Sequence, residues 1–171
     1  KQVKFSFKSK KCISTSRPLE VLHLDLFGPI QIASLGGKIY WLVIVDDYFR
    51  YWVMFLTHKD DTLKNFVSLF ARVQNLIGLQ IVKIRSTMVR NLNFVIFQNF
   101  VITLNLTTQQ NGVVKRKNKT LQKAAKTMLN EYNLPKYFWF ETVNTTCYAM
   151  NRVLLKPILK KISYELFFNK K

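Results

Sequence analysis

The segment from Leu22 to Pro29 places a single aspartate, Asp25, among apolar residues in a stretch that favours a β-strand. Burying a lone carboxylate costs on the order of several kcal/mol, so Asp25 must be solvated, paired or bound to a metal. His23 lies on the same face of the strand as Asp25 and is a candidate partner. A strand-edge carboxylate is more often structural than catalytic, so both a metal site and a structural pair stay open.

A row of lysines is the second group that could do chemistry. The helix predicted from Asn111 to about Asn130 advances about 100° per residue, and four lysines fall in one narrow row. This lysine stripe comprises Lys115, Lys119, Lys123 and Lys126, with Arg116 beside it and Lys117 outside it. The apolar residues gather on another face: Val114, Leu121, Ala125, Met128 and Leu129.

The lysine stripe has no acidic residue nearby to neutralise it. A charged helix face is usually only solvated. Closely spaced cations repel one another, however, and phosphate groups relieve that repulsion while counterions are released. We therefore predict that Arg116 and the lysine stripe contact DNA.

The net charge supports a polyanionic partner. The chain has 27 Lys and Arg against 9 Asp and Glu, a net charge of +18 and a pI near 10.1. Such a charge favours nucleic acid or an anionic membrane surface. The apolar runs Tyr40–Val45 and Tyr51–Leu56 are much shorter than the roughly 20 residues that span a bilayer. We expect DNA as the partner, with no membrane and no small-molecule substrate.

The two cysteines, Cys12 and Cys147, are far apart and lack a CxxC partner. Neither a disulfide framework nor a zinc site is therefore indicated. Lysines interrupt the first apolar residues before a secretory signal could develop, so nothing indicates secretion. We expect an intracellular location, nuclear if the protein is functional.

The elements that must position these groups follow from hydrophobic periodicity. We expect a basic arm over 1–17 and one domain over 18–171. The predicted strands are 19–26, 40–45, 51–56 and 81–84, and the predicted helices are 60–77, 111–130 and 135–154, with a last turn at 164–169. The segment 94–106 is ambiguous, and we assign it a short helix followed by a poor strand. Strands mixed with helices predict an α/β sheet with helices on its faces.

Several stretches together resemble the integrase catalytic core of copia-type long-terminal-repeat retrotransposons. They are Ser14–Pro29, Leu42–Phe55, Ile84–Ser86, Gln109–Leu121 (QQNGVVKRKNKTL) and Leu134–Arg152. The resemblance implies an RNase H-like fold, with a mixed five-stranded sheet flanked by helices and the strand around 91–106 degraded. It also implies polynucleotidyl transfer to DNA by a homo-oligomer. In this family two Asp and one Glu hold two Mg²⁺ or Mn²⁺ ions that activate the attacking oxygen and stabilise the leaving one.

Carried over by motif, the first family aspartate falls on Asp25. The second should follow Ser86, where this chain has Thr87, and the glutamate falls on Lys115. Thr87 and Lys115 are 28 residues apart, whereas the resemblance implies about 35. We expect that neither Mg²⁺ nor Mn²⁺ is bound here, because of the three ligand positions only Asp25 is retained.

The carboxylate deficit is also visible without the family. No Asp or Glu occurs between Asp61 and Glu131, and Glu131 would lie about 24 Å beyond Lys115 along a helix. Asp46 and Asp47 match an Asp-Asp-Tyr sequence that the family places in a hairpin turn, and we interpret them as structural.

Three hypotheses remain from the sequence. The first is a degenerate, catalytically inactive integrase core that still binds nucleic acid. The second is a non-enzymatic DNA-binding protein domesticated from the element. The third is a non-functional relic.

Overall fold

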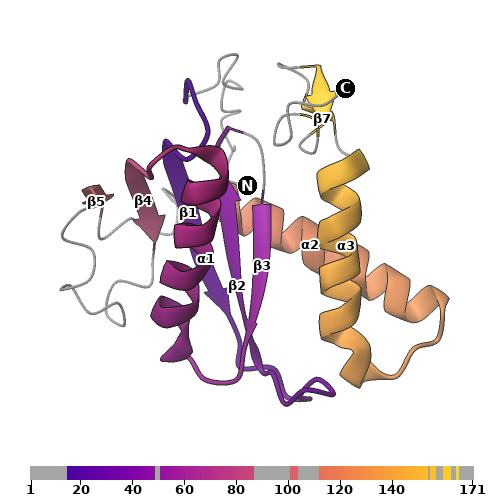
Figure 1. Ribbon diagram of the computed structural model, residues 1–171. Helices are drawn as coiled ribbons and strands as arrows, with labels where there is room; N and C mark the ends of the chain where they lie inside the picture. The colour runs from indigo at the N-terminus through magenta and orange to yellow at the C-terminus, as the bar shows by residue number, and fades with distance from the viewer. Residues whose placement is uncertain are drawn as a thin grey trace, which may run out of the picture.

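A five-stranded sheet forms the centre of the molecule (Figure 1). The computed structural model describes residues 15–48, 51–86, 101–103, 112–153, 155–156, 160–162 and 165. The strands of this sheet are β1 (Val21–Phe27), β2 (Tyr40–Asp46), β3 (Tyr51–Leu56), β4 (Lys83–Ser86) and β5 (Val101–Thr103).

The strand order is β3-β2-β1-β4-β5. The first three strands of the chain pair antiparallel, whereas β4 pairs parallel with β1, and β5 parallel with β4. A parallel neighbour requires a crossover, and α1 (Asp61–Ile77) supplies it between β3 and β4. The predicted mixed five-stranded sheet flanked by helices is confirmed.

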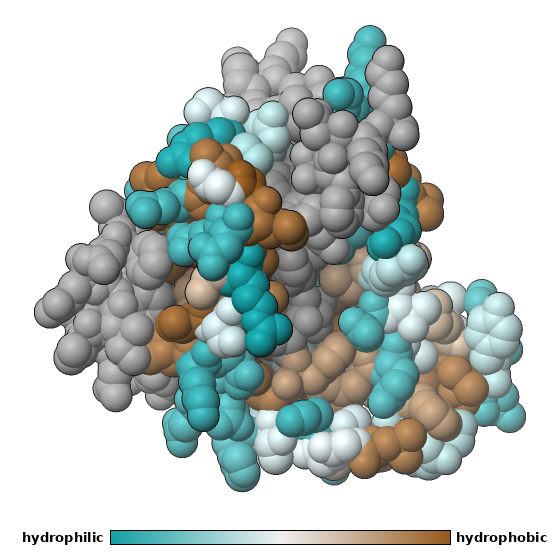
Figure 2. Space-filling model, viewed as in Figure 1, coloured by the Kyte–Doolittle hydropathy of each residue, from teal (hydrophilic) through white to brown (hydrophobic). Residues whose placement is uncertain are grey.

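Helix α1 covers one face of the sheet. Its buried Phe66, Phe70 and Val73 recur at helical spacing and pack with alternate residues of β1 and β2, such as Leu24 and Ile44. The helix ends at Gly78, which adopts the left-handed conformation at φ 70° that favours glycine. On the outer side of α1, hydrophobic residues lie among hydrophilic ones (Figure 2).

Helices α2 (Gly112–Glu131) and α3 (Trp139–Val153) cover the other face. Trp41, Val43 and Val45 of β2 point to this side, because side chains alternate along a strand. They pack with buried residues of both helices: Val114, Leu121 and Ala125 of α2 and Phe140, Val143 and Cys147 of α3. A 3-10 turn, Lys136–Phe138, leads into α3. The predicted helices 111–130 and 135–154 are thus confirmed to within a few residues.

Strand β4 begins two residues later than predicted. Ile81 is buried, but its backbone N–H donates to Gln74 Oε1 at 2.9 Å, at the end of α1. Ile81 is therefore buried without belonging to the strand, and β4 runs from Lys83 to Ser86, two residues beyond the predicted end.

The fifth strand is present but only three residues long, and it pairs with β4. The short helix predicted within 94–106 lies outside the described residues, as does the last turn predicted at 164–169 apart from Glu165. A two-stranded sheet of Leu155–Lys156 and Lys161–Ile162 was not predicted from the sequence.

The predicted turn after β1 is confirmed at Gly28–Pro29, which is a cis peptide bond. Gly28 has φ 128°, and a Cβ atom there would lie 2.6 Å from Ile39 O. This position therefore requires glycine both for its backbone conformation and for the close approach of the chain. Ile30 N then donates to Ile39 O at 2.9 Å and closes the loop.

The start of the domain is fixed by a local cap. The Glu20 carboxylate accepts hydrogen bonds from Ser16 N at 2.6 Å, Ser16 Oγ at 3.0 Å and Arg17 N at 3.3 Å. These bonds, chiefly that from the Ser16 backbone, lower the pKa of Glu20. Thr15 is buried, so residues before 18 take part in packing. The division into a basic arm over 1–17 and a domain over 18–171 stays a prediction, since residues 1–14 lie outside the described residues.

Candidate nucleic-acid interface and metal site

Asp25 lies on the face of the sheet that α2 covers. It is half-buried in β1 directly opposite Val43, whose side chain packs under α2 and α3. Residues directly opposite in an antiparallel pair share a face, so Asp25 points to the same side. The Asp25 carboxylate therefore lies on the side of β1 that α2 and α3 cover, opposite to α1.

The second ligand position follows β4. Ser86, the last residue of β4, pairs with Leu24 of β1 and is fully buried. Thr87 comes directly after Ser86 in the chain and lies outside the described residues. In the described residues, the pairing of β4 with β1 therefore ends at Ser86 and Leu24, one residue before Asp25.

The position that the resemblance assigns to the glutamate, Lys115, lies on a helix that a hydrogen bond joins to the sheet. The Trp41 indole Nε1 donates a hydrogen bond to Asn118 Oδ1 at 3.2 Å, and both side chains are buried. Gln122 Nε2 also donates to this oxygen at 3.2 Å. Lys115 lies three residues before Asn118, on the neighbouring flank of the helix, and is half-buried. The Trp41–Asn118 hydrogen bond thus fixes the helix turn that carries Lys115 against the sheet.

The amphipathic division predicted for α2 is confirmed. Val114, Leu121, Ala125 and Leu129 are buried, whereas Lys119, Lys123 and Lys126 are exposed. Of the remaining predicted residues, Met128 is half-buried and Arg116 is exposed. The lysine stripe is therefore a real surface feature of the helix.

Lys117 lies off the stripe. Loss of hydration lowers the pKa of its amino group, although the side chain reaches the surface. Since it faces a different direction, we do not count it as part of the basic surface.

Asp46 is structural, as interpreted from the sequence. One carboxylate oxygen accepts the backbone N–H of Leu19 at 2.7 Å and the other accepts that of Tyr48 at 2.6 Å. These bonds join the residues before β1 to the end of β2, and the carboxylate is buried between them.

Sequence reasoning missed the contact of His23 with Asp47. His23 is buried, and its Nε2 lies 3.9 Å from Asp47 Oδ1. Such a pair is ionic only when the imidazole is protonated. The alternation that placed His23 beside Asp25 did not reveal this contact across the neighbouring strand.

The donor set does not fit a pair of divalent cations. Mg²⁺ and Mn²⁺ favour carboxylate oxygens, and a two-metal site needs several of them. Across the described part of the chain, no group of three or more His, Cys, Asp or Glu residues could hold a metal ion. Asp25 supplies one carboxylate, while Lys115, which the resemblance aligns with the glutamate, carries an ammonium group.

The described helices give no sign of a membrane segment: none of them is both long and apolar enough to cross a bilayer.

In sequence the chain is similar to the retrovirus-related Pol polyprotein from transposon TNT 1-94 of Nicotiana tabacum. The two are 32% identical over an alignment of 182 residues that covers 99% of this chain and 13% of the polyprotein. The chain therefore corresponds to a small part of that relative's length. No family model matches the sequence.

In structure the chain is similar to retroviral integrases. A chain of the simian T-cell lymphotropic virus intasome, solved in complex with the PP2A regulatory subunit B56 gamma, matches with a TM-score of 0.64 at 14% identity, covering 88% of this chain and 54% of that one. The HTLV-2 integrase catalytic core domain in complex with magnesium, in its trimeric form, matches with a TM-score of 0.58 at 16% identity, covering 88% and 97%.

The sequence similarity spans 99% of the chain, and the structural similarity spans 88% of it. The chain is thus related to a segment of a retrovirus-related Pol polyprotein, and it has the RNase H-like fold of retroviral integrase catalytic cores.

Proposed function

We propose that this chain is a degenerate integrase core of a copia-type retrotransposon, which binds DNA but does not catalyse polynucleotidyl transfer. The observation that carries the proposal is the position of Lys115. It stands on the anchored turn of α2, three residues before Asn118, where the family motif has its glutamate.

The loss of activity follows from the charge of that position. At about 4 Å and an effective dielectric constant of about 20, two unit charges interact by about 4 kcal/mol. Replacing a carboxylate by an ammonium group turns such an attraction toward a metal ion into a repulsion of similar size. Thr87 offers no charge at the second position, so Asp25 is the one anionic ligand that the motif retains.

DNA binding is supported by the surface of α2. Lys119, Lys123 and Lys126 are exposed in one row, and no acidic residue occurs in the sequence from Thr62 to Asn130. A row of lysines on a rigid helix can follow the phosphates of a DNA backbone, with little dependence on base sequence. We expect affinity that falls steeply with salt and little sequence preference.

The relatives suggest how such a chain would act. One similar chain belongs to the simian T-cell lymphotropic virus intasome, and the HTLV-2 integrase catalytic core domain occurs in dimeric and trimeric forms. We propose that this chain also forms homo-oligomers on DNA, and that it acts in the nucleus.

A joining assay beside a filter-binding titration tests the proposal. The full chain is incubated with retrotransposon-end duplex and target DNA in Mg²⁺ or Mn²⁺. We expect retention of duplex DNA on the filter and no joined product. Metal-dependent joining that Asp25→Ala abolishes would contradict the loss of activity, and failure to retain duplex DNA even at low salt would contradict the binding function.

A further inference from the structure

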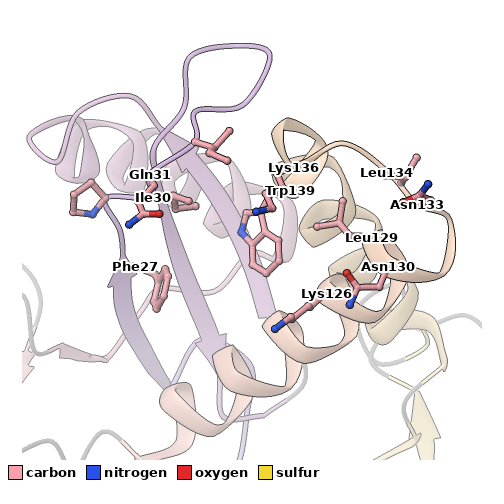
Figure 3. Close-up of a pocket in the computed structure, with 12 residues that line it drawn as sticks. Phe27, Ile30, Gln31, Lys126, Leu129, Asn130, Asn133, Leu134, Lys136 and Trp139 are labelled. Atoms are coloured by element: carbon pink, nitrogen blue, oxygen red, sulfur yellow. The ribbon is translucent and has the colours of Figure 1, made fainter.

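A groove of about 860 Å³ lies beside the lysine stripe (Figure 3). Three segments form it: the end of β1 with the loop that follows, the second half of α2, and the connection from α2 into α3. Both apolar and amide side chains line it, among them Phe27, Ile30, Asn130 and Trp139. The groove is thus continuous with the basic surface proposed to bind DNA.

An exposed aromatic ring marks one side of the groove. Phe27 is 40% exposed, although its ring stacks on the fully buried Trp41 with centroids 4.3 Å apart and an interplanar angle of 25°. Trp41 in turn lies 6.1 Å from Trp139. Phe27 is therefore held rigidly by a core tryptophan while part of its surface stays open to a ligand.

Two lysines give the groove its charge. Lys126 is the last member of the lysine stripe, and in Figure 3 its side chain extends from α2 toward the sheet side of the groove. Lys136 lies at the start of the 3-10 turn and is exposed. None of the described residues that line the groove is acidic. The two lysines therefore favour an anionic ligand, and the exposed ring of Phe27 favours a flat apolar group.

A nucleotide combines these two properties. In a duplex the faces of the bases are covered by their neighbours, so duplex DNA can offer this groove only phosphates. In a single strand an unstacked base exposes a face that can stack on an aromatic side chain. We propose that the groove receives an unstacked base of single-stranded DNA on Phe27, with the adjoining phosphates at Lys126 and Lys136. This inference rests on the proposed DNA binding and deepens it.

Affinities of the full chain for a short oligothymidine and for a duplex of the same length test the proposal by fluorescence anisotropy. Phe27→Ala should weaken single-strand binding about tenfold, since stacking on one aromatic ring has an effect of that order. Duplex binding should change by less than about twofold, because it depends on phosphate contacts. Equal losses for both ligands would overturn the assignment.

Lys136→Ala is the second variant, because this exposed residue belongs to the groove but not to the lysine stripe. It should weaken single-strand binding more than duplex binding, and it leaves the Phe27–Trp41 packing untouched. Lys64→Ala, an exposed lysine of α1 on the opposite face of the sheet, is the matched control and should change neither affinity. A Lys136→Ala variant that binds both ligands like the wild type would count against the groove.

Photocrosslinking locates the base without any substitution in the protein. An oligothymidine carrying 5-iododeoxyuridine should crosslink to the peptides that contain Phe27 or Trp139. Crosslinks confined to other peptides would overturn the proposal. Two competition experiments test the choice of ligand. Tighter binding of an RNA of equivalent sequence, or equal displacement of duplex and single strand by an acidic peptide, would also overturn it.

Loss of DNA binding as a whole and loss of base binding in the groove give different results. If neither duplex nor single strand binds at low salt, the proposed DNA-binding function fails and the groove assignment with it. If the duplex binds through the lysine stripe while the groove variants leave single-strand affinity unchanged, only the groove assignment fails.

Discussion

The two faces of the sheet differ in what their packing contains. The face under α1 is closed by aliphatic and aromatic side chains such as Leu24, Ile44 and Phe70. The face under α2 and α3 also carries polar groups, including Asp25 and the buried Asn118. The core of the first face is apolar, whereas the second face combines an apolar core with a half-buried carboxylate and a buried hydrogen bond between side chains. Changes to the two faces should therefore have separable effects.

Phe70→Ala tests the apolar face and should have the largest effect on stability. Removing a fully buried phenyl ring leaves a cavity, which costs about 3–5 kcal/mol in the free energy of unfolding. Chemical denaturation followed by circular dichroism measures this loss. The wild-type protein should unfold cooperatively, and a sloping wild-type trace would favour the relic hypothesis over a maintained domain.

Asn118→Ala tests the polar packing of the other face. It leaves the buried Trp41 indole N–H without the acceptor seen at 3.2 Å, which should cost about 1–3 kcal/mol. Gln122→Ala removes the second hydrogen bond to Asn118 but keeps the one from Trp41, so it should cost less. If the two variants lose equal stability, the Trp41–Asn118 hydrogen bond is not what anchors α2.

The apolar faces of the helices could be predicted from the sequence, whereas the hydrogen bond between Trp41 and Asn118 could not. Periodicity predicted α1 and α2, because Phe66, Phe70 and Val73 repeat at helical spacing and the lysines of α2 repeat on one side. The Trp41–Asn118 hydrogen bond joins residues 77 positions apart, and no local pattern encodes such a contact. The exposure of Phe27 could not be predicted for the same reason. It depends on helices α2 and α3, which lie much later in the sequence.

The candidate site was predicted unevenly. The resemblance assigned ligand positions to Asp25 and Lys115, and these roles stay predictions; the structure describes Asp25 on the side of the sheet that α2 covers, and Lys115 on α2 itself. Thr87 lies outside the described residues, so its assignment stays a prediction. The groove was missed entirely, because it is lined by three separate segments that become neighbours only in the folded chain.

Reversing charge on the lysine stripe should change binding and leave the fold intact. The double variant Lys119→Glu with Lys123→Glu should weaken duplex binding by at least about tenfold and reduce the slope of log K against log salt by about two. Its unfolding free energy should stay within about 0.5 kcal/mol of the wild type, because both side chains are exposed. Lys64→Ala is again the control, and an unchanged salt slope in the double variant would remove the stripe from the interface.

Glu20→Gln should have a small and pH-dependent effect. Hydrogen bonds lower the pKa of Glu20 in the folded chain, so its charge stabilises the fold above the unfolded-state pKa. That contribution is lost as the pH falls through the folded-state pKa. Thermal melts should therefore show a small deficit for the variant at neutral pH that disappears in acid; a deficit that persists in acid would assign it to something other than the charge.

Restoring the two carboxylates should have no effect on activity. Thr87→Asp combined with Lys115→Glu recreates the ligand types, but the 28-residue spacing is shorter than the family's, and small displacements of reacting groups cost large factors in rate. The joining assay in Mn²⁺ should stay blank, as it should when Asp25→Ala is added. Joining by the double variant alone would show that the scaffold still positions its ligands.

The hydrogen bond between Trp41 and Asn118 involves none of the three ligand positions. A helix held in this way keeps its place whether the neighbouring charges suit a metal or not. Substitutions at the ligand positions can therefore change the chemistry of this molecule without disturbing the packing of α2. A fold of this kind can persist in a chain whose metal ligands have been replaced.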